Sequence, residues 1–297
     1  MVNLFGEEEL DVTHSVLRQR FVEPPFSILD TRQAEWQERK RTWKKLGIRP
    51  EIVNENNTKT FNISEWASEK ADKDMPAISI FDPALCEVMY KWFCPDGGLI
   101  LDPFAGGAVR GIVANFMGYH YTGIDIRKEQ IDDNRQQALD ILPVNNQPQY
   151  YVGDSNKLLG DWVAQCEDWE EGCGHYDLVF SCPPYADLEK YSDLEGDISN
   201  MNYADFLSAY RSIIAKACFL LKDGGMACFV VGEVRDKKGN FYGLVPDTIK
   251  AFKDAGMAFY NEIIMVTPTG TAAIRAGGMM KNKKIVRTHQ NILVFIK

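Results

Sequence analysis

Two short segments of the chain combine residue types that can hold a cofactor and orient a planar group. Residues 102–107, with the sequence DPFAGG, follow the apolar run 99–101. Residues 181–185, with the sequence SCPPY, follow the apolar run 178–180. A glycine-rich turn lets the backbone approach a ligand closely, and a Pro-Pro-aromatic turn offers a rigid carbonyl group and a flat ring. Together the two segments predict a site for a nucleotide-like cofactor beside a planar substrate group.

The elements that must position these segments are strands alternating with helices from about residue 75 onward. Residues 83–93, for example, carry apolar side chains at helical spacing directly before the first strand. This alternation predicts an α/β fold with a mainly parallel, seven-stranded sheet and helices on both faces. The expected strands are residues 99–101, 121–126, 150–152, 178–180, 226–231, 262–266 and 291–296. Ligands of such sheets bind at the carboxyl ends of the strands, where both segments lie.

Three successive predicted strands end in residues that suit a nucleoside-containing cofactor. Gly106 stands in the first turn, before a helix whose amino end presents free N–H groups. Asp125 ends the next strand, at about the distance where an acid can bind two ribose hydroxyls. Asp154 ends the third strand and can accept from an adenine amino group. The simpler alternative is an ordinary strand-to-helix turn with a capping acid, which the threefold pattern disfavours.

The second segment suits chemistry on an exocyclic amine of a nucleobase. Such an amine is a poor nucleophile because its lone pair is conjugated into the ring, and hydrogen-bond acceptors on its two hydrogens can free that lone pair. We expect the Pro183 carbonyl to accept, Tyr185 to stack on the base, and Ser181 or Cys182 to help from the side chain. The base would leave the duplex to reach this pocket, and orientation would supply most of the catalysis.

These motifs resemble those of the amino-group DNA methyltransferases, which form N6-methyladenine or N4-methylcytosine. The resemblance covers about residues 78–297 and implies a class I, Rossmann-like, S-adenosylmethionine-dependent methyltransferase fold. Residues 102–107 are similar to the family's cofactor motif, and residues 182–185 stand where the family carries Asp, Asn or Ser before Pro-Pro-aromatic. The whole chain, including residues 32–40, is similar to methylases encoded by phages and prophages, and restriction–modification is one setting that the resemblance implies.

The resemblance implies S-adenosylmethionine as the cofactor and double-stranded DNA as the partner. The implied catalytic residues are Ser181, Cys182, Pro183, Pro184 and Tyr185. The implied cofactor-binding residues are Ser79, Phe81, Asp102, Phe104, Gly106, Asp125 and Asp154. Ser79 and Phe81 belong to a segment similar to the one that closes over the methionine part of the cofactor. No metal is expected, because the sequence contains no cluster of metal-ligating residues.

Cys182 is the main departure from the family pattern. A thiol is a weak acceptor, so the choice between adenine and cytosine stays open. Cys182 also suggests a nucleophile for cytosine carbon-5 methylation, although those enzymes carry Pro-Cys and this chain has Cys-Pro-Pro. Further alternatives are an RNA base or a protein glutamine as substrate, and a non-catalytic DNA-binding subunit. Intact Asp102, Gly106 and Asp125 argue against a decayed site.

Two basic stretches are candidates for contacts outside the pocket. Residues 267–290 separate the last two predicted strands, and residues 263–297 contain no acid. We expect this insertion to contact DNA through Arg275, Lys281, Lys283, Lys284 and Arg287; a solvated loop is the simpler alternative. A basic helix within residues 32–45 is a second candidate, for DNA or for a partner protein.

Length and composition are those of one large domain with an appendage. The 297 residues carry a net charge of −9, which argues weakly against nucleic acid, since binding depends on local patches. We expect an N-terminal extension over residues 1–75 and a methyltransferase domain over residues 76–297. Seven cysteines without a C-x-x-C pair, no long apolar run and no signal-peptide pattern predict a reduced, cytoplasmic protein that does not enter membranes. The extension suggests a possible homo-oligomer or partner protein.

Overall fold

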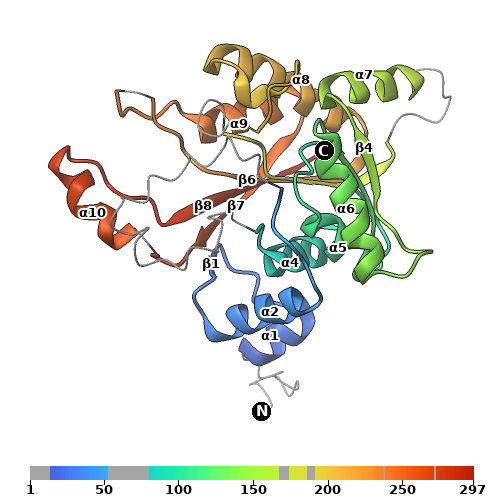
Figure 1. Cartoon of the computed structure of the whole chain (residues 1–297), viewed down its shortest axis with the longest axis horizontal. Helices are drawn as coiled ribbons and strands as arrows, with labels where there is room; N and C mark the ends of the chain where they lie inside the picture. Colours follow the sequence, from blue (N-terminus) through green and yellow to red (C-terminus); the bar gives the residue numbers. More distant parts are fainter. Residues whose placement is uncertain (1–13, 53–79, 167–173, 186–190, 237, 271) are drawn as a thin grey trace, which may run out of the picture.

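One sheet organises the part of the chain that the computed structural model describes (Figure 1). The described residues are 14–52, 80–166, 174–185, 191–236, 238–270 and 272–297. The strands are β1 (Ile28–Asp30), β2 (Leu99–Asp102), β3 (His120–Asp125), β4 (Gln149–Val152), β5 (Tyr176–Ser181), β6 (Leu221–Val231), β7 (Ala258–Val266) and β8 (His289–Ile296). Their order in the sheet is β1-β7-β8-β6-β5-β2-β3-β4. Strand β8 is antiparallel to both of its neighbours, and every other pair is parallel.

The predicted α/β fold is confirmed, with one strand more than expected. All seven predicted strands are present. The eighth is β1, which pairs in parallel with β7 at Ile264–Val266. The Thr31 hydroxyl continues this connection, because it donates a 2.9 Å hydrogen bond to the carbonyl oxygen of Val266. The described N-terminal residues thus extend the central sheet, and the expected boundary near residue 75 lies outside the described residues.

The order of the strands reverses beside β2. The chain runs outward from β2 through β3 to β4, and it then returns to β5, which pairs with the opposite side of β2. In a parallel sheet such a switch point opens a crevice at the carboxyl ends of the strands. Residues 102–107 begin at the end of β2, and residues 181–185 begin at the end of β5. The topology therefore brings both sequence motifs to one crevice.

Helices cover both faces of the sheet. They are α1 (His14–Phe21), α2 (Ala34–Lys45), α4 (Pro83–Phe93), α5 (Val109–Phe116), α6 (Lys128–Ile141), α7 (Ser155–Cys166), the short η3 (Ile198–Asn200), α8 (Tyr203–Phe219), α9 (Leu244–Asp254) and α10 (Ala272–Lys281). In Figure 1, α7, α8 and α9 lie above the sheet, and α4 and α5 lie below it, with α1 and α2 outside them. The described helices include none that is long and apolar enough to cross a membrane.

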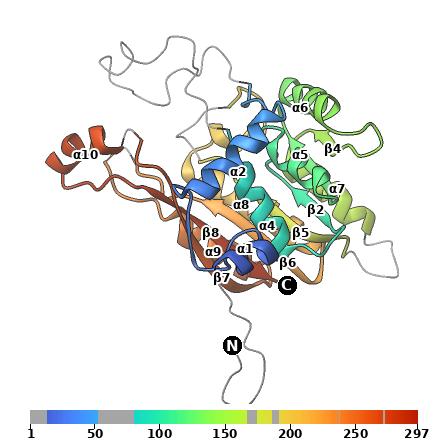
Figure 2. The same ribbon diagram turned by 90° about the horizontal axis from the view of Figure 1, so that it is seen from below.

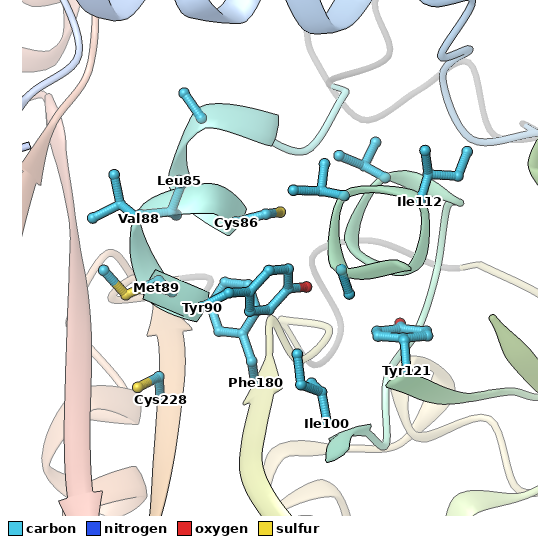
Figure 3. Packing of buried hydrophobic residues seen from close by; sticks show 14 of the residues in the cluster. Leu85, Cys86, Val88, Met89, Tyr90, Ile100, Ile112, Tyr121, Phe180 and Cys228 are labelled. Carbon is cyan, nitrogen blue, oxygen red and sulfur yellow. The ribbon is translucent and has the colours of Figure 1, made fainter. Parts of the chain in front are cut away.

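The strands supply two cores because neighbouring side chains point to opposite faces. Ile100 packs into the α4–α5 core and Leu101 into the α8–α9 core. In β5, Phe180 joins the first core and Val179 the second. Figure 3 shows the first core, where residues of α4 and α5 meet Phe180 and other strand residues. The strand residues that lead into both motifs are therefore buried, which fixes where each motif begins.

Helix α4 begins and ends where the sequence predicts, for local reasons. The Asp82 carboxylate accepts a 3.0 Å hydrogen bond from the backbone N–H of Ala84, and Pro83 suits the first helical turn. The buried indoles of α2 reach the same helix, because the Trp36 ring N–H donates to Asp82 and the Trp43 ring N–H donates to Glu87. Helix α2 is thereby held against α4.

Helix α10 lies in the expected insertion between β7 and β8. In Figures 1 and 2 it stands at the left, away from the layers of helices that cover the sheet. We assigned no secondary structure to this insertion from the sequence, and a solvated loop was the simpler alternative. The structure thus gives the basic insertion a helical framework at one end of the sheet.

Candidate active site

The two motifs line one cavity of about 570 Å³ at the switch point. This volume is within the range of small-molecule sites. Gly106, Asp125 and Asp154 line the cavity from the ends of β2, β3 and β4, and Pro183 and Tyr185 line it from the end of β5, the neighbour of β2 on its other side. Residues predicted from separate stretches of sequence are thus brought together in one pocket.

A buried hydrogen-bond network beneath the cavity joins the two motifs. The Ser181 hydroxyl donates to Asp102 Oδ1 at 2.5 Å, and the Tyr121 hydroxyl donates to Asp102 Oδ2 at 2.7 Å. Asp102 and Ser181 are completely buried, and neither is part of the cavity wall. We expected both to contact ligands directly. In the structure their polar atoms hydrogen-bond to each other and to the network, which links the end of β2 to the end of β5.

Arg110 is the cationic member of this network, and the sequence analysis did not find it. Its Nε donates to Asp102 Oδ2 at 2.5 Å, and Nη2 donates to the carbonyl oxygens of Phe104 and Ala105 at 2.7 and 2.9 Å. The guanidinium also lies 4.5 Å from the ring centre of Phe81. Burial by itself would lower the pKa of Arg110, but Asp102 raises it well above its ordinary value. A permanent charge therefore holds the glycine turn in place.

The glycine turn and Asp125 form the next part of the cavity wall. Gly106 has φ +48°, a left-handed conformation that favours glycine. Its N–H donates to Asp125 Oδ2 at 3.0 Å. The other oxygen, Oδ1, accepts from the Arg127 backbone N–H at 2.9 Å. Burial opposes the charge of Arg127, but Asp125 and Glu51 raise its pKa above the ordinary value. Asp125 is thereby fixed beside a cation at the end of β3.

Asp154 lies beside residues 191–197, which come after the Pro-Pro-aromatic turn along the chain. It accepts from the backbone N–H of Asn156 at 2.8 Å, at the start of α7. Gly196 approaches so closely that a Cβ atom there would be 3.0 Å from Asp154 Oδ2. Tyr191 also lines the cavity, and its ring centre is 5.4 Å from the guanidinium of Arg127. The loop that carries Tyr191 and Gly196 therefore closes the side of the cavity that Asp154 bounds.

The Pro-Pro-aromatic turn contributes to the cavity wall at the end of β5. Cys182, Pro183, Pro184 and Tyr185 all line the cavity. The Tyr185 hydroxyl accepts a 3.1 Å hydrogen bond from the side-chain amide of Gln290, near the start of β8. Strand β8 thus helps to fix the ring that was predicted to stack on a base. Gln290 is a second site residue that sequence reasoning missed.

The remaining predicted cofactor residues have different outcomes. Phe81 and Phe104 line the cavity. The Phe81 ring packs edge-on against Phe180, with ring centres 5.9 Å apart. Ser79 lies outside the described residues. The N-terminal segment also reaches the cavity through Lys40, which the sequence analysis assigned to a basic surface and which forms a 3.0 Å ion pair with Asp82.

The predicted DNA-binding cations are divided between two environments. Arg275, Lys281 and Lys283 are exposed on or beside α10. Lys284 turns toward the loop around Gly239, where a Cβ atom would overlap its ammonium group. Arg287 is half-buried, and burial lowers its pKa. Of these five, the first three present their charges most directly to solvent.

The chemistry of the cavity fits S-adenosylmethionine. Carboxylates at the ends of β3 and β4 suit a ribose diol and an adenine amino group. Among the described residues, no group of three or more His, Cys, Asp or Glu side chains is placed to hold a metal ion.

The chain is similar to several solved structures and matches one family model. None of the curated proteins matches the chain. Similar solved structures include a TehB-like SAM-dependent methyltransferase from Corynebacterium glutamicum, at 16% identity over 69% of this chain and 82% of that chain, with a TM-score of 0.39. Another is a proposed DNA modification methylase from Thermus thermophilus in complex with S-adenosyl-L-methionine, at 23% identity over 49% of this chain and 54% of that chain, with a TM-score of 0.34.

The family assignment comes from a match in sequence. The family model N6_N4_Mtase, described as DNA methylase, matches residues 21–136 and 176–297. These ranges include both motifs, strand β1 and the basic insertion. Because they cover more than half of its length, the chain belongs to the DNA methylase family.

Proposed function

We propose that the protein transfers a methyl group from S-adenosylmethionine to the exocyclic amine of adenine or cytosine in DNA. The observation that carries this proposal is the shared cavity at the switch point. The glycine turn, Asp125 and Asp154 line it at the ends of β2, β3 and β4, and the Pro-Pro-Tyr turn lines it at the end of β5. Membership of the DNA methylase family supports DNA over an RNA base or a protein glutamine as the substrate.

In this proposal the cofactor is held by the ends of β2, β3 and β4. Asp125 binds the ribose hydroxyls, Asp154 binds the adenine amino group, and Phe81 covers the methionine part. The cofactor supplies an electrophilic methyl group on a sulfonium centre. Arg110 keeps the turn and Phe81 in register, since it contacts both.

The target base enters from the side of the Pro-Pro-Tyr turn. Tyr185 stacks on the base, and its hydrogen bond with Gln290 fixes the plane of the ring. The Pro183 carbonyl accepts from the amine and directs the lone pair of the nitrogen toward the methyl group. The nitrogen–carbon bond forms as the sulfur–carbon bond breaks, and the amine then loses a proton to water. Ser181 acts at a distance by holding the turn on Asp102.

The DNA backbone is contacted by the basic insertion in this proposal. Arg275, Lys281 and Lys283 are exposed on or beside α10, which stands away from the sheet in Figure 2. Such cations attract phosphates without reading sequence. A phage origin, a restriction–modification setting, a cytoplasmic location and a homo-oligomer or partner protein remain predictions.

Transfer of a labelled methyl group tests the class of substrate. Purified protein is incubated with S-adenosylmethionine carrying a tritiated methyl group and with unmethylated duplex DNA, RNA of the same sequence, or protein. We expect label in the duplex DNA, and transfer to DNA by Tyr185→Ala that is about 10- to 100-fold slower. Label in RNA or protein alone would refute the proposed substrate.

A further inference from the structure

Residues 49–52, here called the strap, connect the N-terminal segment to the cofactor side of the cavity. The backbone N–H of Arg49 donates to Gln137 Oε1, and that of Ile52 donates to Gln130 Oε1, both at 2.8 Å. Gln130 and Gln137 are buried side chains of α6. A buried amide oxygen without a hydrogen-bond donor would destabilise the fold, and the strap supplies a donor to each of these two side-chain oxygens. The strap is therefore a fixed part of the site.

The strap brings the carboxylate of Glu51 onto the glycine turn. Glu51 Oε1 accepts from the Gly107 N–H at 2.6 Å. A Cβ atom at Gly106 would overlap this oxygen, and one at Gly107 would lie 2.8 Å from Glu51 Cγ. The same buried residues of α6 hold the turn, because Gln130 donates to Asn134 and Asn134 donates to the Gly106 carbonyl oxygen at 2.7 Å. The two glycines leave the space that Glu51 fills.

The surroundings of Glu51 leave its negative charge incompletely neutralised. The side chain lines the cavity and is 28% exposed. Its nearest described cation is Arg127, at 3.8 Å, and Arg127 is closer to Asp125, at 3.3 Å. Burial raises the pKa of Glu51, and Asp125 raises it further, whereas Arg127, Arg110 and the Gly107 N–H oppose them. A cationic ligand in the cavity would favour the ionised carboxylate.

We propose that Glu51 is a cofactor-binding residue that receives the positively charged methionine end of S-adenosylmethionine at the glycine turn. That end of the cofactor carries an ammonium and a sulfonium centre. The inference rests on the proposed function, and it adds a ligand from the N-terminal segment to the carboxylates at the ends of β3 and β4. If the Glu51 carboxylate only filled the turn, it would compete with the cofactor, and removing its charge would tighten cofactor binding. If it binds the cofactor, removing its charge would weaken binding.

Calorimetric titration of the full-length protein with S-adenosylmethionine tests the role of Glu51. Glu51→Gln keeps the shape and a hydrogen-bonding oxygen but removes the charge. We expect the Kd to rise about tenfold or more, with the melting temperature of the cofactor-free protein unchanged. Glu51→Asp, which restores the charge, should recover part of the affinity. Glu129→Gln is the matched control, because Glu129 is an exposed acid in the first turn of α6 and lies outside the cavity wall.

The pH dependence of binding supplies a readout that a purely structural role would not change. As the pH falls through the raised pKa of Glu51, the wild-type carboxyl becomes neutral and its attraction for the cofactor is lost. Asp125, Arg127 and Arg110 face Glu51 in both proteins, so the difference between wild type and Glu51→Gln isolates this group. We expect the loss of affinity in that interval to be smaller in Glu51→Gln.

Two results would overturn the assignment of Glu51. Equal or tighter cofactor binding by Glu51→Gln would show that the carboxylate only fills or blocks the turn. Equal losses in Glu51→Gln and Glu51→Asp, with the same pH profile as wild type, would show that the side chain acts through shape alone. Failure of the wild-type protein to bind the cofactor would refute the proposed function as well, which is a distinct outcome.

Discussion

The substitution Asp102→Asn tests the network on which both motifs depend. Asp102 Oδ1 accepts from the Ser181 hydroxyl and the Phe104 N–H, and Oδ2 accepts from Arg110 Nε and the Tyr121 hydroxyl. An asparagine keeps one acceptor oxygen and turns its NH₂ group toward the other pair of donors. It also leaves the buried guanidinium of Arg110 without its counter-charge.

The expected loss in the free energy of unfolding is about 3–5 kcal/mol, as for a buried pair that loses one member. Urea denaturation followed by circular dichroism measures it. Asp254→Asn is the control, because Asp254 pairs with Lys250 on the surface, and its urea midpoint should not change. The double variant Asp102→Asn/Arg110→Met should be less destabilised than the sum of the single variants, because it has no unpaired buried charge. A loss below about 1 kcal/mol for Asp102→Asn would refute the reasoning.

Three further substitutions test the cavity walls. Tyr185→Ala should lower the rate of methyl transfer about 10- to 100-fold with cofactor affinity retained, because base stacking is lost. Tyr185→Phe should keep most of the rate. A wild-type rate in Tyr185→Ala would exclude stacking. Asp125→Ala should raise the calorimetric Kd for S-adenosylmethionine at least about tenfold, because two hydrogen bonds to a charged group are removed, and an unchanged Kd would contradict its assignment. Cys182→Ser should stay active in the transfer assay, whereas complete loss with a trapped wild-type adduct on 5-fluorocytosine DNA would favour carbon-5 chemistry.

Local patterns were sufficient to predict most of the sheet and the position of both motifs. Buried strands such as residues 99–101 and 178–180 are short apolar runs bounded by turns. The local sequence therefore indicates both that they are strands and where they end. The start of α4 follows from the capping Asp82 and from Pro83 in its first turn. Because parallel strands share one carboxyl edge, Gly106 and Tyr185 could be placed in one pocket without a structure.

The missed residues depend on contacts between distant parts of the chain. Strand β1 has three residues and pairs with a strand far along the chain, as the Thr31–Val266 contact across 235 positions shows. Glu51 meets Gly107 across 56 positions, and it lies in no periodic pattern. Arg110 is the one charged residue of helix α5, which is otherwise uncharged. A charge in such a helix indicates a buried partner of opposite charge, and we did not use this signal in predicting the site.

Mass spectrometry of nucleosides tests the central claim most directly. Duplex DNA is incubated with the purified protein and S-adenosylmethionine, digested, and compared with DNA treated with Tyr185→Ala. We predict N6-methyladenine or N4-methylcytosine in the wild-type reaction and far less of either in the variant. A peak of 5-methylcytosine, or no methylated nucleoside from a protein that binds the cofactor, would contradict amino-group methylation of DNA by this site.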